Sequence, residues 1–216
     1  MKRILLMAIA LLFGFLLASA AWYYSRLNTG KSRTANRTAK SAITPALKSK
    51  LNQHADQLLL YARQHGYNTG TCFLIDMSIE SGKNRFFVFD MQKDSVLDAA
   101  LVAHGSCNKS WLSGRQYGNE VGCGCTSLGK YKIGAPYKGR FGVAYKLYGL
   151  DATNSNAFER CVVLHSYYAV PDAEVHPYPI CQSQGCPMVS PTFLNKLAGI
   201  INASKKPMLL YTFDKN

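Results

Sequence analysis

Two residues in the last quarter of the sequence have the types and surroundings that thiol chemistry requires. Cys186 lies in the run SQGCPM, directly after Gly185 and directly before a proline. His165 lies about twenty residues upstream, at the end of the apolar run VVLH. A thiol is mostly protonated and slow to react at neutral pH unless a neighbouring base takes its proton. The pattern therefore predicts Cys186 as a nucleophile and His165 as its general base.

The residues just before Cys186 could form the rest of such a site. Gly185 allows the backbone to approach a substrate closely and can free amide N–H groups to bind an oxyanion, which makes Ser183 and Gly185 candidate substrate or oxyanion residues. Taken alone, a cysteine and a histidine more often form a half-cystine and a strand-end histidine with no catalytic role. The order of the surrounding motifs is what favours chemistry here.

The order of these motifs resembles the L,D-transpeptidase catalytic domain (YkuD-like) family, in which a His-Ser pair precedes Ser-x-Gly-Cys. The segment TSLGKYKI, residues 126–133, is similar to the family's TPxGxFxI strand, and GCPMVSP is similar to the branch in which proline follows the nucleophile. The resemblance extends from Phe73 to the C-terminal helix. The commoner members have His at the position of Gln184 and Arg or Asn at the position of Met188, so the contacts of those side chains are not carried over.

The resemblance implies acyl transfer on peptidoglycan stem peptides, with no cofactor. The thiol would attack the carbonyl of the third stem residue, expel the terminal D-Ala and leave a thioester that an amine of another stem resolves. His165 would carry the proton and be steadied by a backbone carbonyl, while Ser166 would shape the site. Tyr167, Tyr168 and Tyr178 could line the groove. His104 begins an HG pair that the same branch contains, which makes it a candidate for the site wall and a competitor for the role of base.

Other functions compete with this interpretation. Water in place of the amine would make the same site an L,D-carboxypeptidase. A non-catalytic, disulfide-stapled envelope domain could instead bind glycan or protein through its Tyr-rich loops, with Cys186 paired. A sortase-like enzyme requires an Arg after the cysteine, and none follows Cys186. A papain-like peptidase has the opposite order of Cys and His.

The composition and the charge distribution predict an exported protein. The 216 residues, 48% hydrophobic and 17% charged, suit one globular domain with a short appendage. Nine Lys or Arg and no acidic residue occur in the first 50 positions, which hold much of the formal charge of +13. Residues 4–21 form an apolar run after a basic start, so we predict a signal peptide or inner-membrane signal anchor over 1–24. A basic flexible linker over 25–44 and the catalytic domain over 45–216 would follow, in the periplasm or cell envelope and with no nucleic-acid partner.

Hydrophobic periodicity predicts the elements of the domain. Three- and four-residue spacing after Thr44 predicts an amphipathic helix that ends at Gly66, with His54 and His65 at the surface or in capping positions. Short apolar strands are expected at 72–76, 85–91, 96–104, 128–134, 140–150 and 162–165, then a helix after Pro191 and a closing strand at 208–213. This is a mostly-β domain with a helix at each end, consistent with the β-sandwich-like fold that the resemblance implies.

The seven cysteines of an exported chain suggest disulfides. Six could pair and leave Cys186 free. Proximity in the sequence favours pairing of Cys107 with Cys123 or Cys125, and of Cys161 with Cys181. Cys123 and Cys125 could instead bind zinc together with His104, but a single residue between the two cysteines is shorter than structural zinc sites use, so we expect no metal.

Overall fold

The computed structural model describes residues 14, 19, 43–110 and 114–215. The chain divides into two units, Met1–Ala42 and Ile43–Asn216. Nearly all of the predicted signal segment and of the predicted linker lies outside the described residues. Within the part that is described, no helix is both long and apolar enough to cross a membrane. The second unit contains all the elements discussed below.

The second unit begins with helix α2, Pro45–His65, whose ends follow from its sequence. The hydroxyl of Thr44 accepts a hydrogen bond from the Leu47 amide at 3.2 Å, and proline occupies the first helical position, where its missing N–H costs nothing. Gly66 ends the helix in the left-handed conformation, at φ 75°, and its N–H donates to the Ala62 carbonyl. The structure confirms the predicted helix.

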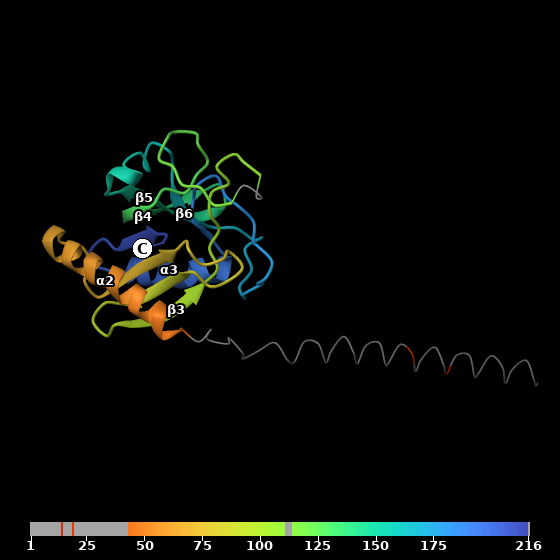
Figure 1. The fold of residues 1–216 in the computed structure, drawn as a ribbon, viewed down its shortest axis with the longest axis horizontal. Helices are drawn as coiled ribbons and strands as arrows, with labels where there is room; N and C mark the ends of the chain where they lie inside the picture. Colours follow the sequence, from red (N-terminus) through yellow and green to blue (C-terminus); the bar gives the residue numbers. More distant parts are fainter. Residues whose placement is uncertain (1–13, 15–18, 20–42, 111–113, 216) are drawn as a thin grey trace, which may run out of the picture. The chain divides into compact units, whose positions relative to one another are not determined.

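Within the described ranges, eight strands form one continuous sheet, and a second helix follows the seventh strand. The strands are β1 Thr71–Asp76, β2 Phe86–Asp90, β3 Ser95–Ala100, β4 Gly129–Gly139, β5 Gly142–Gly149, β6 Val163–Ser166, β7 Met188–Val189 and β8 Leu209–Phe213; the helices are α3 Pro191–Ala203 and the short 3₁₀ turn η2 Ala152–Asn154. Their order across the sheet is β3-β2-β1-β8-β4-β5-β6-β7. The prediction of a mostly-β domain with a helix near each end is confirmed (Figure 1).

Strand β8 joins the two halves of this sheet. It runs parallel to β1, with Leu210 opposite Phe73, and antiparallel to β4, with Leu210 opposite Tyr131. The predicted hairpin of β1 and β2 is present, with Phe73 paired to Val88. Because β8 lies between β1 and β4, residues from the two ends of the domain fix the middle of the sheet.

The two faces of the sheet bury separate apolar clusters. On one face, α2 packs Leu51 and Leu58 over alternate residues of β1 and β2, among them Leu74 and Phe87 (Figure 1). On the other face, α3 contributes Phe193 and its neighbours to a larger cluster that includes residues of β1, β2, β4, β5 and β6. This second cluster lies beneath β6 and β7, the two strands that flank the predicted nucleophile.

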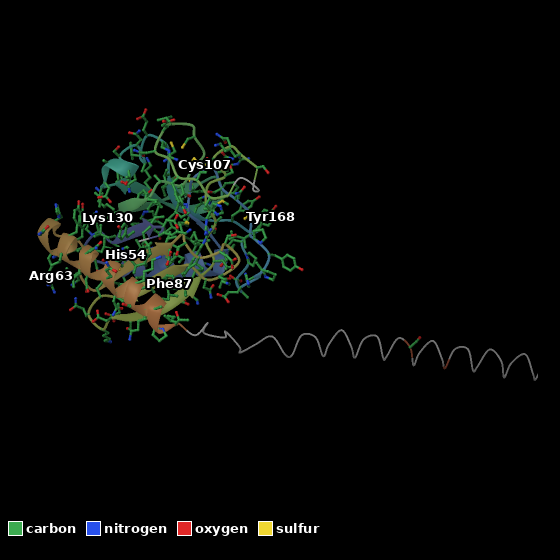
Figure 2. All side chains as sticks on the ribbon, in the orientation of Figure 1. His54, Arg63, Phe87, Cys107, Lys130 and Tyr168 are labelled. Atoms are coloured by element: carbon green, nitrogen blue, oxygen red, sulfur yellow. A yellow bond between two sulfur atoms is a disulfide. The ribbon has the colours of Figure 1, made fainter. Side chains whose placement is uncertain are left out.

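Three details of the predicted elements are wrong. Strand β3 ends at Ala100 rather than at His104. Strand β4 does not end at Gly134 but continues through Pro136 to Gly139, where a tight turn leads to Gly142; a register shift between Ile133 and Pro136 accommodates the proline, which has no amide hydrogen to donate. His54 is buried rather than exposed: it projects from α2 between helix and sheet and stacks on Phe213 with ring centroids 3.8 Å apart (Figure 2). Because histidine is polar, the sequence pattern did not show that His54 lies on the apolar face of the helix.

The cysteine pairings are confirmed only in part. Cys107 and Cys125 form a disulfide, as one of the two alternatives expected. The expected pair of Cys161 with Cys181 is wrong, because both are free, and so are Cys72, Cys123 and Cys186. Cys72 is a core residue of β1, where burial raises the pKa of its thiol far above the ordinary value. The expectation that six cysteines pair is therefore not met.

Candidate active site

The turn that carries Cys186 requires glycine at position 185. Gly185 has φ +109°, a conformation that residues with a side chain rarely adopt. A Cβ at this position would lie 2.6 Å from the Cys125 carbonyl oxygen and 3.1 Å from Nη2 of Arg160. The Gly185 amide donates to the hydroxyl of Ser183 at 3.1 Å, so in this structure Ser183 shapes the turn and that amide is not free for an oxyanion.

The thiol of Cys186 is free and half-buried. The amide of Val163 donates to Sγ at 3.4 Å, and Sγ donates to the carbonyl of Cys161 at 3.7 Å. Burial raises the pKa of Cys186, while the Val163 amide and the positive charge of Arg160 act in the opposite direction. Burial is the largest of these effects, so the thiol is protonated at neutral pH in this state.

The imidazole of His165 is held in one tautomer. His165 is buried on β6, and its Nδ1 lies 3.0 Å from the carbonyl oxygen of Ser166. A carbonyl oxygen can only accept, so Nδ1 carries the hydrogen and Nε2 carries the lone pair that a general base needs. Burial lowers the pKa of His165 below its ordinary value, which keeps the ring neutral. The ring of Phe141 stacks on it with centroids 5.3 Å apart.

The sheet places the thiol and the imidazole on neighbouring chain segments. Strands β6 and β7 are parallel, with His165 opposite Met188, and the Val163 amide contacts the sulfur of Cys186. Cys186 and His165 are thus two positions out of register on adjacent segments, a Cα separation of about 8 Å from the strand spacing and rise. Among the described residues, the hydrogen-bond partners of Sγ are backbone groups rather than the imidazole.

A cavity of about 320 Å³ lies on the segment whose backbone contacts Sγ, and we call it the Lys146 groove. Its lining includes Cys161 and Val163, whose backbone groups contact Sγ, and also Glu159. Lys146 crosses it with Nζ 4.9 Å from the ring centroid of Phe158 and 5.9 Å from that of Tyr137. A cation between exposed aromatic rings offers both charge and apolar contact to a ligand beside the thiol.

His104 lies behind the nucleophile turn. Its carbonyl accepts from the Ser183 amide at 2.8 Å, while its buried ring lines a second cavity, of about 730 Å³, together with Arg115. Its Nδ1 lies 3.0 Å from Nη2 of Arg85, so Nδ1 is the acceptor. Burial and then the charges of Arg85 and Arg115 lower the pKa of His104 to about 4. The geometry favours a place in the wall of the site over the role of base.

The remaining candidates lie around His165. Ser166 contributes its carbonyl, as described, and Tyr167 lies edge-on to Phe141 with centroids 5.4 Å apart. Tyr168 is largely exposed at the periphery of the molecule (Figure 2), and Tyr178 lines the second cavity near His104. Three residues that the sequence did not single out lie around the site: Arg160 behind the Cys186 turn, Lys146 in the groove, and Phe141 against His165. They lie in polar or strand segments with no motif, and it is the fold that brings them to this place.

The sequence profile of the L,D-transpeptidase catalytic domain matches residues 43–213, most of the chain. The chain belongs to the L,D-transpeptidase catalytic-domain family. Among curated proteins, none matches the chain. The expected membership is thus confirmed over the whole of the second unit up to the end of β8.

The solved structures that resemble the chain are distant neighbours. One is the L,D-transpeptidase, residues 123–326, from Xylanimonas cellulosilytica DSM 15894, with 16% identity and a TM-score of 0.39 over 71% of this chain and 68% of that one. Another is the helical cell shape determining protein Pgp2 from Campylobacter jejuni, with 14% identity and a TM-score of 0.45 over 68% of this chain and 48% of that one. The Ldtfm-avibactam carbamoyl enzyme has 14% identity and a TM-score of 0.40 over 68% and 49%. The chain thus spans about half the length of the last two.

Proposed function

We propose that this L,D-transpeptidase family member modifies peptidoglycan by acyl transfer through Cys186, with His165 as general base. The observation that carries the proposal is that two reactive groups lie on adjacent chain segments. One is a free thiol on a turn that requires glycine, and the other is an imidazole whose lone pair is on Nε2 because Nδ1 donates to the Ser166 carbonyl. The alternative function, a non-catalytic binding domain, requires Cys186 in a disulfide, and the free thiol disfavours that alternative.

The reaction begins with a neutral Cys186 thiol and a neutral His165 imidazole. Burial raises the pKa of Cys186 and lowers that of His165, so proton transfer accompanies attack on the substrate rather than preceding it. For this transfer Sγ must leave the Val163 amide and reach Nε2 when the substrate binds. Such catalytic contacts are often long without substrate and shorten when it binds.

The chemical steps then follow in two halves. Sγ attacks the carbonyl carbon of the third stem residue as Nε2 of His165 takes the thiol proton. The tetrahedral intermediate collapses to a thioester, and the same proton passes to the departing amine of D-Ala. An amine of a second stem attacks the thioester, gives its proton to Nε2 and releases the thiol. The backbone amide of Cys186 is our candidate donor to the oxyanion, because the Gly185 amide is taken by Ser183.

The Lys146 groove is our proposed entry for the acyl donor. Stem peptides carry carboxylates, and Lys146 provides a positive charge between two aromatic rings next to the backbone groups that contact Sγ. Glu159 in the same lining would repel a second carboxylate and so restrict how the stem lies. We further propose that the protein is exported and acts in the periplasm or cell envelope, with residues 4–21 as its export signal or inner-membrane anchor.

The experiment is incubation of the purified protein with a tetrapeptide stem, with and without an amine acceptor, followed by mass spectrometry. We expect loss of D-Ala and an acyl adduct on the peptide that contains Cys186. A product joined to the amine identifies a transpeptidase, and a free tripeptide identifies a carboxypeptidase.

Two variants control the experiment. Cys186→Ala removes the sulfur and should abolish both adduct and turnover, and His165→Gln should lower turnover by at least about a hundredfold through loss of the general base. Full turnover by Cys186→Ala would exclude this mechanism.

A further inference from the structure

Arg160 lies directly behind the nucleophile turn, held by three neutral acceptors. Its Nη1 donates to the Gly118 carbonyl at 2.9 Å and to the hydroxyl of Ser127 at 3.1 Å, and its Nη2 donates to the Cys125 carbonyl. The described residues place no carboxylate within ion-pair distance of it. A guanidinium fixed in this way keeps a full positive charge that no acidic partner offsets.

The same guanidinium lies where the side chain of any residue other than glycine at position 185 would begin. A Cβ there would lie 3.1 Å from Nη2 of Arg160 and 2.6 Å from the carbonyl oxygen of Cys125, which accepts a hydrogen bond from the same Nη2. Arg160 and the carbonyl of Cys125 therefore form the rear wall of the turn that presents Cys186. Any loosening of this wall would change where the sulfur points.

The chain on either side of Arg160 also reaches the sulfur. The next residue, Cys161, accepts from Sγ through its carbonyl, and Val163 donates to Sγ through its amide. One short segment, residues 160–163, thus supplies the rear wall, the charge and both backbone contacts of the thiol.

We propose that Arg160 is a positioning residue for the nucleophile: its guanidinium fixes the turn that carries Cys186 and supplies the positive charge that favours the thiolate over the thiol. The role rests on the proposed function in naming Cys186 as the nucleophile. The other titratable groups that interact with or lie near the thiol are Cys161, Tyr131 and His165. A thiol or a phenol can add only negative charge, and the neutral imidazole adds none. Lys146 and Glu159, of opposite charge, line the neighbouring groove, and Arg160 is the cation that lies against the turn of Cys186. Consistently, Arg160 acts to lower the pKa of Cys186 against the effect of burial.

The test measures the thiol itself and needs no substrate. The rate at which iodoacetamide alkylates Cys186, followed on its own peptide by mass spectrometry across a range of pH, reports the thiolate fraction. We expect Arg160→Gln to be alkylated about tenfold more slowly at neutral pH, the effect of one nearby charge on an ionisation, and to regain the wild-type rate at higher pH. Arg160→Lys keeps the charge and should restore the wild-type profile at neutral pH.

The matched control is Arg63→Gln, the same loss of charge at the exposed end of α2 (Figure 2), which should leave the profile unchanged. An Arg160→Gln protein that keeps the wild-type circular dichroism and the wild-type profile would overturn the proposal. If that variant does not fold, Arg160→Met, which keeps the length of the side chain and removes its charge, decides: a folded protein with slow alkylation at neutral pH supports the role, and a folded protein with the wild-type profile refutes it. Because no stem peptide is present, these outcomes are independent of whether the protein transfers acyl groups.

Discussion

His104 should make the protein lose stability on mild acidification. Its ring is buried beside Arg85, and its pKa in the folded state is about 4, against 6.5 for an unperturbed histidine. The folded value is the lower one, so as the pH falls the unfolded chain binds this proton first, and stability present above the unfolded pKa is lost. Between pH 7 and pH 4.5 this single group should cost about 2.5 kcal/mol of the free energy of unfolding.

The measurement is urea unfolding at a series of pH values, for the wild type and for His104→Asn. The Asn side-chain oxygen can accept from Arg85 as Nδ1 does, but it does not titrate, so the difference in stability between the two proteins should shift by about 2.5 kcal/mol over that interval in favour of the variant. His65→Asn, at the exposed end of α2, shows the effect of removing a solvent-exposed histidine. If the stabilities of wild type and His104→Asn run parallel from pH 7 to pH 4.5, the ring is not kept neutral by burial and the reasoning fails.

Three further outcomes can be measured. Replacement of Cys107 and Cys125 together by Ser should lower the free energy of unfolding by about 3 kcal/mol, the stabilisation of a short closed loop. A reducing agent should lower the free energy of unfolding of the wild type by the same amount and leave that of the variant unchanged. Ser190→Ala removes the side chain that accepts from the Phe193 amide at 3.1 Å and should cost about 1 kcal/mol in thermal unfolding, whereas Ser190→Asp should cost less. Lys146→Gln should raise KM for a tetrapeptide about tenfold with little change in kcat, and Lys146→Arg should not; an equal loss in kcat would place the charge at the reacting atoms rather than at the entry.

The sequence predicted best what depends on local pattern. The caps of α2, the β1–β2 hairpin and the α3 helix after Pro191 follow from neighbouring residues, and each occurs where expected. The positions of Cys186 and His165 on a turn and a strand end are local in the same sense. The family resemblance added what no local pattern contains, which is the expectation that a backbone carbonyl steadies the imidazole.

The rest depends on contacts between distant parts of the chain. Nothing near Arg160 marks it as a neighbour of Gly185, because Ser127, Cys125 and the turn converge only in the folded sheet. The same holds for buried Arg85, whose guanidinium is satisfied by carbonyls and by the ring of His104. Charged residues are rarely buried without partners, and a sequence shows the charge but not the partners.

The place of β8 in the sheet sets the order in which the domain can be completed. Strands β3, β2 and β1 on one side, and β4 to β7 on the other, are hydrogen-bonded to each other only through Leu209–Phe213 within the described sheet. A chain still being synthesised exposes two unpaired strand edges until those residues arrive, and such edges favour association with other chains. The sheet that carries Cys186, between β6 and β7, is therefore complete only once the chain up to Phe213 has been made.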